Sequence, residues 1–311
     1  MKPVFLPFLF AAAGTLASFA AAQPENAALP PRENAETRLA LSPFSPVEAH
    51  AAAQPAFPPD ALRRVVREKT IRGENGEEII RFRVDAEYFA NRPALNREIF
   101  RSALPPRADE KSPADTLPPE AATDRFIADE TQDCLRERAL TGAGENGVPS
   151  IPHEILSSAR IFGPVGDVAP ACVFFWRFAG GAHGIGGFAC RNFSLSEERE
   201  LRLADVFEEG SEPALRKALE KNDPRRGSAD FPREESDGGS PFPSKPEPTE
   251  NFLVLRDGLL FVYNHYDIDC YAAGIIVIFV PYTEISEALR ADFSERIRRS
   301  RRAEAPADAA R

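Results

Sequence analysis

The strongest constraint on the fold of this chain is a β-hairpin signal at Asn75 and Gly76. Both residues tolerate the positive φ that a tight hairpin turn requires, and strand-like runs at residues 62–71 and 78–88 flank them. From Ile80 onwards, apolar residues occupy every second position of the later run. A period of two gives a strand one buried and one solvated face, so other elements must cover one side of this hairpin.

Further apolar runs predict additional strands and a small number of helices. We expect strands at residues 157–162, 172–178, 188–195, 251–262 and 274–282. Helical spacing of apolar residues predicts helices at 91–104, 121–139 and 283–297, and a short strand–turn–helix passage over 203–220. This mixture predicts an α+β fold, in which an antiparallel β-sheet carries packed helices in a single compact unit.

Residues 1–22 have the order of parts of a cleavable secretory signal. Lys2 supplies the positive charge, residues 4–13 form an apolar run, and the small residues Ala20 and Ala22 precede the expected cleavage point. A retained membrane anchor is the alternative, but the apolar stretch is short for a span. We therefore expect an exported protein, in the periplasm or outside the cell, with no membrane span after cleavage.

Three segments have compositions that differ from the strand and helix regions. Residues 23–60 are rich in alanine and proline and predict a disordered tether. Residues 222–250 are poor in apolar side chains and predict a disordered insertion, and residues 293–311 predict a basic helix end and tail. The chain has a formal net charge of -10, and loss of Lys2 with the signal makes it one unit more negative. This acidity argues against nucleic acid and anionic membrane surfaces as partners.

The four cysteines favour disulfide bonding over a metal site. An exported chain with an even number of cysteines is expected to form disulfides, and the spacings lack the close Cys pairs of zinc sites. Cys172 and Cys190 flank the glycine-rich bend at residues 180–184 almost symmetrically, so a hairpin would bring them together. Cys134 and Cys270 would then pair or remain as thiols. No cofactor and no metal site is predicted.

Two segments contain candidate binding residues. In the bend at residues 180–184, Gly181 permits unusual backbone angles and His183 is either a ligand and proton carrier or a turn histidine bonded to the backbone. The second interpretation is preferred, because His183 lacks the sequence partners that catalysis needs.

The second segment links two apolar strands. Its candidate residues are Tyr263, His265, Tyr266 and Asp267. His265 and Asp267, together with Asp269, are either a metal or acid–base cluster or part of a structured loop whose tyrosines pack and whose acids face water, and the loop is preferred. No nucleophile elbow, phosphate-binding loop or dinucleotide fingerprint occurs in the sequence.

Several motifs together resemble a known family. The segments 251–274 and 280–285, preceded by the bend at 180–184 and by 203–207, resemble DUF3298 domains. Upstream, Val84-Asp-Ala-Glu-Tyr-Phe89 and Leu95-Asn-Arg-Glu-Ile99 resemble the DUF4163 half that often accompanies them. The resemblance divides the chain into a DUF4163-like half at 61–200 and a DUF3298-like half at 201–292, and it implies an α+β extracytoplasmic module.

The resemblance also implies a choice of functions. Similar proteins include the extracellular part of RsiV-type anti-sigma factors, which sense lysozyme by binding it, and cell-wall enzymes that carry a deacetylase domain. We expect neither sigma-factor control nor deacetylation here, because the segments for both are missing from this sequence. The leading hypothesis is a binding module for a lysozyme-like muramidase or for cell-wall glycan (peptidoglycan). The alternative is a cell-wall hydrolase or deacetylase-like enzyme that uses His183 or the loop at 263–271.

Overall fold

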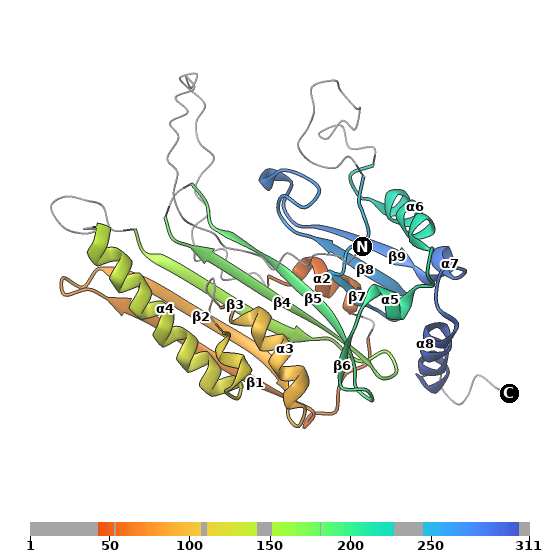
Figure 1. Ribbon diagram of the computed structural model, residues 1–311, viewed down its shortest axis with the longest axis horizontal. Coiled ribbons are helices and arrows are strands. Elements are labelled where there is room, and N and C mark those ends of the chain that lie inside the picture. Colours follow the sequence, from red (N-terminus) through yellow and green to blue (C-terminus); the bar gives the residue numbers. More distant parts are fainter. Residues whose placement is uncertain are drawn as a thin grey trace, which may run out of the picture.

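The computed structural model describes residues 43–52, 54–106, 111–141, 151–180, 182–226 and 245–304. Within them, two β-sheets pack face to face, and helices cover the outer face of each sheet (Figure 1). The α+β class is therefore confirmed. The predicted signal at residues 1–22 lies outside the described residues. Among the residues that are described, no helix has both the length and the apolar character of a membrane span.

The large sheet has the strand order β1-β2-β3-β4-β5-β6. Its strands are β1 (Leu62–Arg72), β2 (Glu78–Phe89), β3 (His153–Ile161), β4 (Val168–Phe178), β5 (Ile185–Ser194) and β6 (Arg199–Leu201). The predicted hairpin is confirmed, because β1 and β2 pair antiparallel and Gly76 has a φ of 80°. The expectation of a fully antiparallel sheet is wrong at one place, where β2 and β3 run parallel.

Two long helices account for that parallel pair. A parallel connection must cross over the sheet, which requires a long segment between the strands. Here α3 (Pro93–Ala103), the 3-10 turn η1 (Pro113–Asp115) and α4 (Pro119–Thr141) make the crossover. Figure 1 shows α3 and α4 lying across one face of the large sheet, where Phe100 and Phe126 belong to the core beneath them.

The small sheet covers the opposite face of β4 and β5. It contains β7 (Phe252–Val254), β8 (Gly258–Tyr263) and β9 (Ile276–Pro281). Alternation along β8 divides its side chains between two cores, since Leu260 faces the large sheet and Phe261 faces the outer helices. These helices are α5 (Leu203–Val206), α6 (Glu212–Asn222), α7 (Tyr282–Ile285) and α8 (Ala291–Glu304).

Three expected elements differ in detail. A turn divides the predicted strand at 251–262 into β7 and β8. In this turn, Leu255 N donates a hydrogen bond to Gly258 O at 2.9 Å. Residues 203–206 form the helix α5 instead of a strand. The helix expected from Thr283 is split into α7 and α8, because the chain turns at residues 286–290, where Leu289 pairs with Phe207.

The predicted tether is wrong over its last part. Residues 45–51 form the short helix α2 (Ser45–Ala51), and Phe44 and Val47 are fully buried between the two sheets. The ring centroids of Phe44 and Phe188 on β5 are 5.7 Å apart. The guanidinium carbon of Arg160 also lies over the Phe44 ring, 5.5 Å from its centroid. Two apolar residues in a short helix give too little periodicity to read from sequence. Residues 23–42 lie outside the described part.

The predicted insertion is also ordered at both ends. Arg225 forms ion pairs with Asp223 at 3.0 Å and with Asp269 at 3.1 Å, which fixes the segment after α6 to the loop after β8. On the other side, Tyr263 Oη donates to Glu247 O at 2.7 Å. These contacts make the disordered expectation wrong for residues 222–226 and 245–250. Residues 227–244 lie outside the described residues, as does the tail at 305–311.

Candidate functional site

The glycine-rich bend and the loop after β8 meet at Gly184. A Cβ at this position would lie 2.2 Å from the Trp176 indole, so only glycine allows the ring to cover the backbone here. The Gly184 carbonyl accepts two hydrogen bonds, from Tyr271 Oη at 3.1 Å and from His183 Nδ1 at 2.9 Å. A hydrogen bond thus connects the bend between β4 and β5 to a loop almost ninety residues later in the chain. Gly181 lies outside the described residues.

Two histidines enclose the Tyr271 ring. The His183 ring stacks on Tyr271 at a centroid distance of 3.9 Å, and the His265 ring stacks on it at 4.2 Å. His265 Nδ1 also contacts Tyr271 O at 3.2 Å. Because carbonyl oxygens only accept, each Nδ1 carries a hydrogen, and each neutral imidazole keeps a lone pair on Nε2. The structure therefore brings together the two predicted histidines, through a tyrosine that the sequence did not single out.

Three further aromatic side chains lie near this stack, and of these Tyr266 is exposed while Trp176 and Phe178 are half-buried. Tyr266 lies 5.9 Å from the Tyr271 ring, is 46% exposed and has a φ of 70°. A non-glycine residue in the left-handed region is uncommon, and such residues concentrate at functional sites. Trp176 and Phe178 stack on each other at 6.2 Å. We define the aromatic cluster as Trp176, Phe178, His183, His265, Tyr266 and Tyr271.

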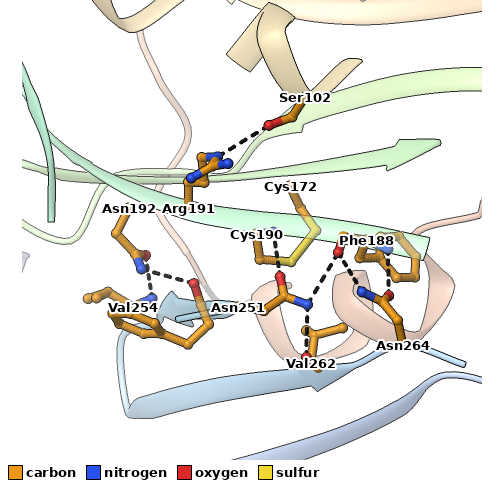
Figure 2. The surroundings of a disulfide bond; sticks show 11 residues. Ser102, Cys172, Phe188, Cys190, Arg191, Asn192, Asn251, Val254, Val262 and Asn264 are labelled. Atoms are coloured by element: carbon orange, nitrogen blue, oxygen red, sulfur yellow. Dashed lines mark hydrogen bonds between the residues drawn. A yellow bond between two sulfur atoms is a disulfide. The ribbon is translucent and has the colours of Figure 1, made fainter. Parts of the chain in front are cut away.

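The loop that carries the cluster is held by its own polar groups. Asp267 Oδ2 accepts from Asn264 N at 2.7 Å, and Asp267 N donates to Asn264 O at 3.1 Å. The Asn264 amide in turn binds the backbone of Phe188 on β5 (Figure 2). Sequence reasoning missed Asn264. An asparagine directly after an apolar strand signals a turn, but nothing in the sequence links it to β5.

The other predicted residues have different surroundings. The Tyr263 ring belongs to the core between the small sheet and its outer helices, so it lies outside the aromatic cluster. Burial raises the pKa of Tyr263 above its ordinary value. Burial likewise raises the pKa of the Asp267 carboxyl, although the residue as a whole is exposed. Partial burial lowers the pKa of His265, which favours the neutral imidazole.

The arrangement offers binding surfaces more readily than acid–base chemistry. Asp267 is engaged by the Asn264 backbone, and Asp269 forms an ion pair with Arg225. Neither contact places a carboxylate against an imidazole, which a nucleophile–base–acid set would need. In the described part of the chain, no group of three potential ligands is placed to hold a metal ion.

The predicted disulfide is confirmed beside this region. Cys172 and Cys190 are directly paired in the β4–β5 register, with a Cα–Cα distance of 4.2 Å, and are bonded to each other. Such a distance is typical of a non-hydrogen-bonded antiparallel pair, in which side chains approach closely. The bond lies in the core beneath α2, between the two sheets (Figure 2). Cys134 and Cys270 are not part of it.

Comparisons with known proteins find similarity to one family in the C-terminal part of the chain. Residues 204–283, which include the loop after β8, match the sequence profile of "Protein of unknown function (DUF3298)". A solved DUF3298 family member from Bacteroides fragilis NCTC 9343 superposes with a TM-score of 0.59 at 18% identity, over 76% of this chain and 96% of its own. A DUF3298 protein from Pseudomonas aeruginosa PAO1 gives 0.52 at 19% identity, over 76% and 97%. No curated protein matches the chain. At these identities the structural likeness concerns the fold.

Proposed function

We propose that this chain is an exported binding module of the DUF3298 type, and that its aromatic cluster recognises a component of the cell wall. The observation that carries the proposal is the stack of His183, Tyr271 and His265, presented next to the exposed Tyr266. The likeness of the upstream half to DUF4163 and the likeness to RsiV-type proteins remain predictions.

Rigid aromatic side chains suit recognition of a large ligand. Tyrosine and tryptophan bury much area on binding while losing little side-chain freedom, and they dominate the energetics of many interfaces. Here the backbone holds the rings in advance, since Gly184 O anchors both Tyr271 and His183. A preorganised surface loses less entropy when the ligand binds.

The cluster favours cell-wall glycan as the ligand. Sugar rings present flat arrays of C–H groups, which pack on aromatic faces, and hydroxyls, which donate to acceptors such as the Nε2 atoms of His183 and His265. Tyr266, which is 46% exposed, adds a further aromatic face.

Net charge favours a second candidate, a basic lysozyme-like muramidase. The chain carries a formal charge of -10, and opposite charges speed the encounter of two proteins. A hydrolase or deacetylase-like activity has less support, since the loop acids form hydrogen bonds or ion pairs with the backbone and with Arg225, and Asp267 interacts with His265 through its charge.

Binding measurements on the exported protein test the proposal. Calorimetry with soluble peptidoglycan fragments and with lysozyme, each at low and physiological salt, separates the two candidates. Glycan binding is expected to change little with salt, whereas lysozyme binding should weaken through a slower association rate. Tyr266→Ala should weaken the interaction at least tenfold, and Leu140→Ala, at an 83% exposed position on α4, should leave it unchanged.

The same measurements can reject the proposal. Absence of binding to either ligand at micromolar concentration in low salt would remove cell-wall recognition. If Tyr266→Ala and His265→Ala left the affinity unchanged, the ligand would bind outside the aromatic cluster.

A further inference from the structure

The inward face of α4 changes from apolar to polar along the helix. Its first half contributes residues such as Phe126 to the core between the helices and the large sheet. Its second half presents Glu130, Cys134 and Arg138 to the same sheet. Residues four positions apart lie above one another on a helix, so these three side chains form one stripe, here called the polar stripe.

The two ends of the polar stripe form ion pairs with the sheet. Glu130 is buried and its carboxylate binds the guanidinium of Arg177 on β4. Arg138 Nη2 donates to Glu77 Oε1 at the β1–β2 turn, at 2.6 Å. The middle residue of the stripe is therefore placed between two arginine–carboxylate pairs.

That middle residue is a thiol in contact with an imidazole. Cys134 Sγ lies 3.3 Å from Nδ1 of His153, the first residue of β3. Cys134 is 5% exposed and His153 is half-buried, so the pair lies at the border of the core. At this distance, the imidazole accepts the thiol proton or, when protonated, donates to the thiolate. A neighbouring base is one of the surroundings that activate cysteines.

One buried donor lies on the same face of the sheet. Arg177 Nε is buried and has no hydrogen-bond partner in the part of the chain that is described. Arg177 pairs with Ile155 across the sheet, and Ile155 is two residues from His153, so both side chains project to the α4 side. Buried donors are rarely left without a partner, so Arg177 is a second unusual polar group on the face of the sheet that α4 covers.

We propose that Cys134 is a redox-modifiable thiol that His153 activates, with a peroxide as the oxidant. His153 Nδ1 takes the thiol proton, and the thiolate sulfur attacks one peroxide oxygen. The S–O bond forms as the O–O bond breaks, so sulfur loses two electrons and the peroxide gains them. The departing hydroxide takes the imidazole proton and leaves as water, and Cys134 becomes a sulfenic acid.

The other cysteines are placed differently. Cys172 and Cys190 are bonded to each other in the core on the opposite face of the large sheet. Cys270 is half-buried in the loop that carries the aromatic cluster. Because the other cysteines lie elsewhere, we expect oxidised Cys134 to remain a sulfenic acid. A dimedone-type probe traps this product.

The test uses the full chain with Cys270→Ser, so that Cys134 is the reacting thiol. Hydrogen peroxide with the dimedone probe should label Cys134 in the folded protein, as mapped by mass spectrometry. His153→Phe should slow this labelling at least tenfold, while His50→Gln, on α2, should leave the rate unchanged. A melting curve shows whether each variant is folded.

A second measurement does not depend on the His153 variant. The rate of Cys134 alkylation by iodoacetamide should reach half of its plateau at a lower pH than that of N-acetylcysteine in the same buffers. Three results would overturn the proposal: an unlabelled Cys134 in folded protein, an equal rate in folded His153→Phe, or an alkylation profile at or above that of N-acetylcysteine.

Discussion

The side-chain amide of Asn264 forms two hydrogen bonds with the backbone of Phe188. Asn264 Oδ1 accepts from Phe188 N at 2.7 Å, and Nδ2 donates to Phe188 O at 3.0 Å, as a paired strand residue would. A Cβ on Gly187 would lie 2.5 Å from that amide oxygen, so glycine makes room for it. The edge of β5 is thus satisfied by a side chain of the small sheet.

Two more asparagines connect the two sheets, since Asn251 binds the backbone of β5 and Asn192 on β5 binds the backbone of β7. Asn251 Oδ1 accepts from Cys190 N at 2.7 Å, and its Nδ2 donates to Val262 O at 2.8 Å. Asn192 donates to Phe252 O at 2.9 Å and accepts from Val254 N at 2.7 Å. Figure 2 shows all three amides between the sheets, around the disulfide. An exposed strand edge invites pairing with other chains, and these amides block part of it.

Removing the Asn264 amide should destabilise the fold. Asn264→Ala leaves the buried N–H of Phe188 without a partner and removes one of the two amide donors to Phe188 O, so we expect a loss of about 1–3 kcal/mol in the free energy of unfolding. Asn91→Ala, at an exposed position, should change it by less than about 0.5 kcal/mol. Urea denaturation measures both. Equal stability of the two variants would mean that the amide is structurally neutral.

Loss of the disulfide should also lower stability. Cys172 and Cys190 are separated by 18 residues, and a loop of this size predicts a contribution of about 3 kcal/mol. The double replacement by alanine, which introduces no buried hydroxyl, should reduce the denaturation midpoint accordingly. Cys270→Ser provides the control with little expected change. A double variant as stable as the parent protein would contradict the prediction.

Helix α2 should be required for a stable core. Phe44 is 0% exposed, and replacing such a ring by alanine costs about 3–5 kcal/mol unless the segment detaches first. Detachment would uncover the disulfide, so Phe44→Ala should also speed reduction of Cys172–Cys190 by dithiothreitol. Ala49→Ser, on the exposed side of α2, should do neither. If Phe44→Ala changed neither the stability nor the rate of disulfide reduction, the segment would act as the tether predicted from the sequence.

Acid should weaken the fold through Asp85. Burial raises the pKa of this carboxyl, but hydrogen bonds from Arg64 and Arg160 outweigh it and lower the pKa from 3.8 to about 2. A lowered pKa stabilises the folded state above pH 3.8, and the stabilisation is lost as the pH falls towards 2. The shift corresponds to about 2 kcal/mol.

The Asp85→Asn variant isolates this effect from that of other acids. Its free energy of unfolding should fall less steeply than that of the parent between pH 5 and pH 2, by about 2 kcal/mol over the range. Chemical denaturation at each pH measures the difference. Parallel curves for the two proteins would show that Asp85 binds its proton equally in both states.

The candidate site was only partly accessible from the sequence. His183 and His265 stood out because histidines are few and both lie in unusual loops. Tyr271 did not, because its importance comes from lying between rings that are far apart along the chain. Tyr263 appeared equivalent to Tyr266 in sequence, yet one ring is buried beneath helices and the other is exposed.

The sequence by itself determined the features that depend on near neighbours. These are the β1–β2 hairpin, the α+β class and the pairing of Cys172 with Cys190 around one bend, because periodicity, turn chemistry and short loops are local properties. Tertiary structure decided the burial of α2, the parallel pairing of β2 with β3 and the stack on Tyr271. Asn264 and Phe188 are 76 residues apart, and nothing local specifies such a contact. Which amides complete which strand edge follows only once the two sheets have packed.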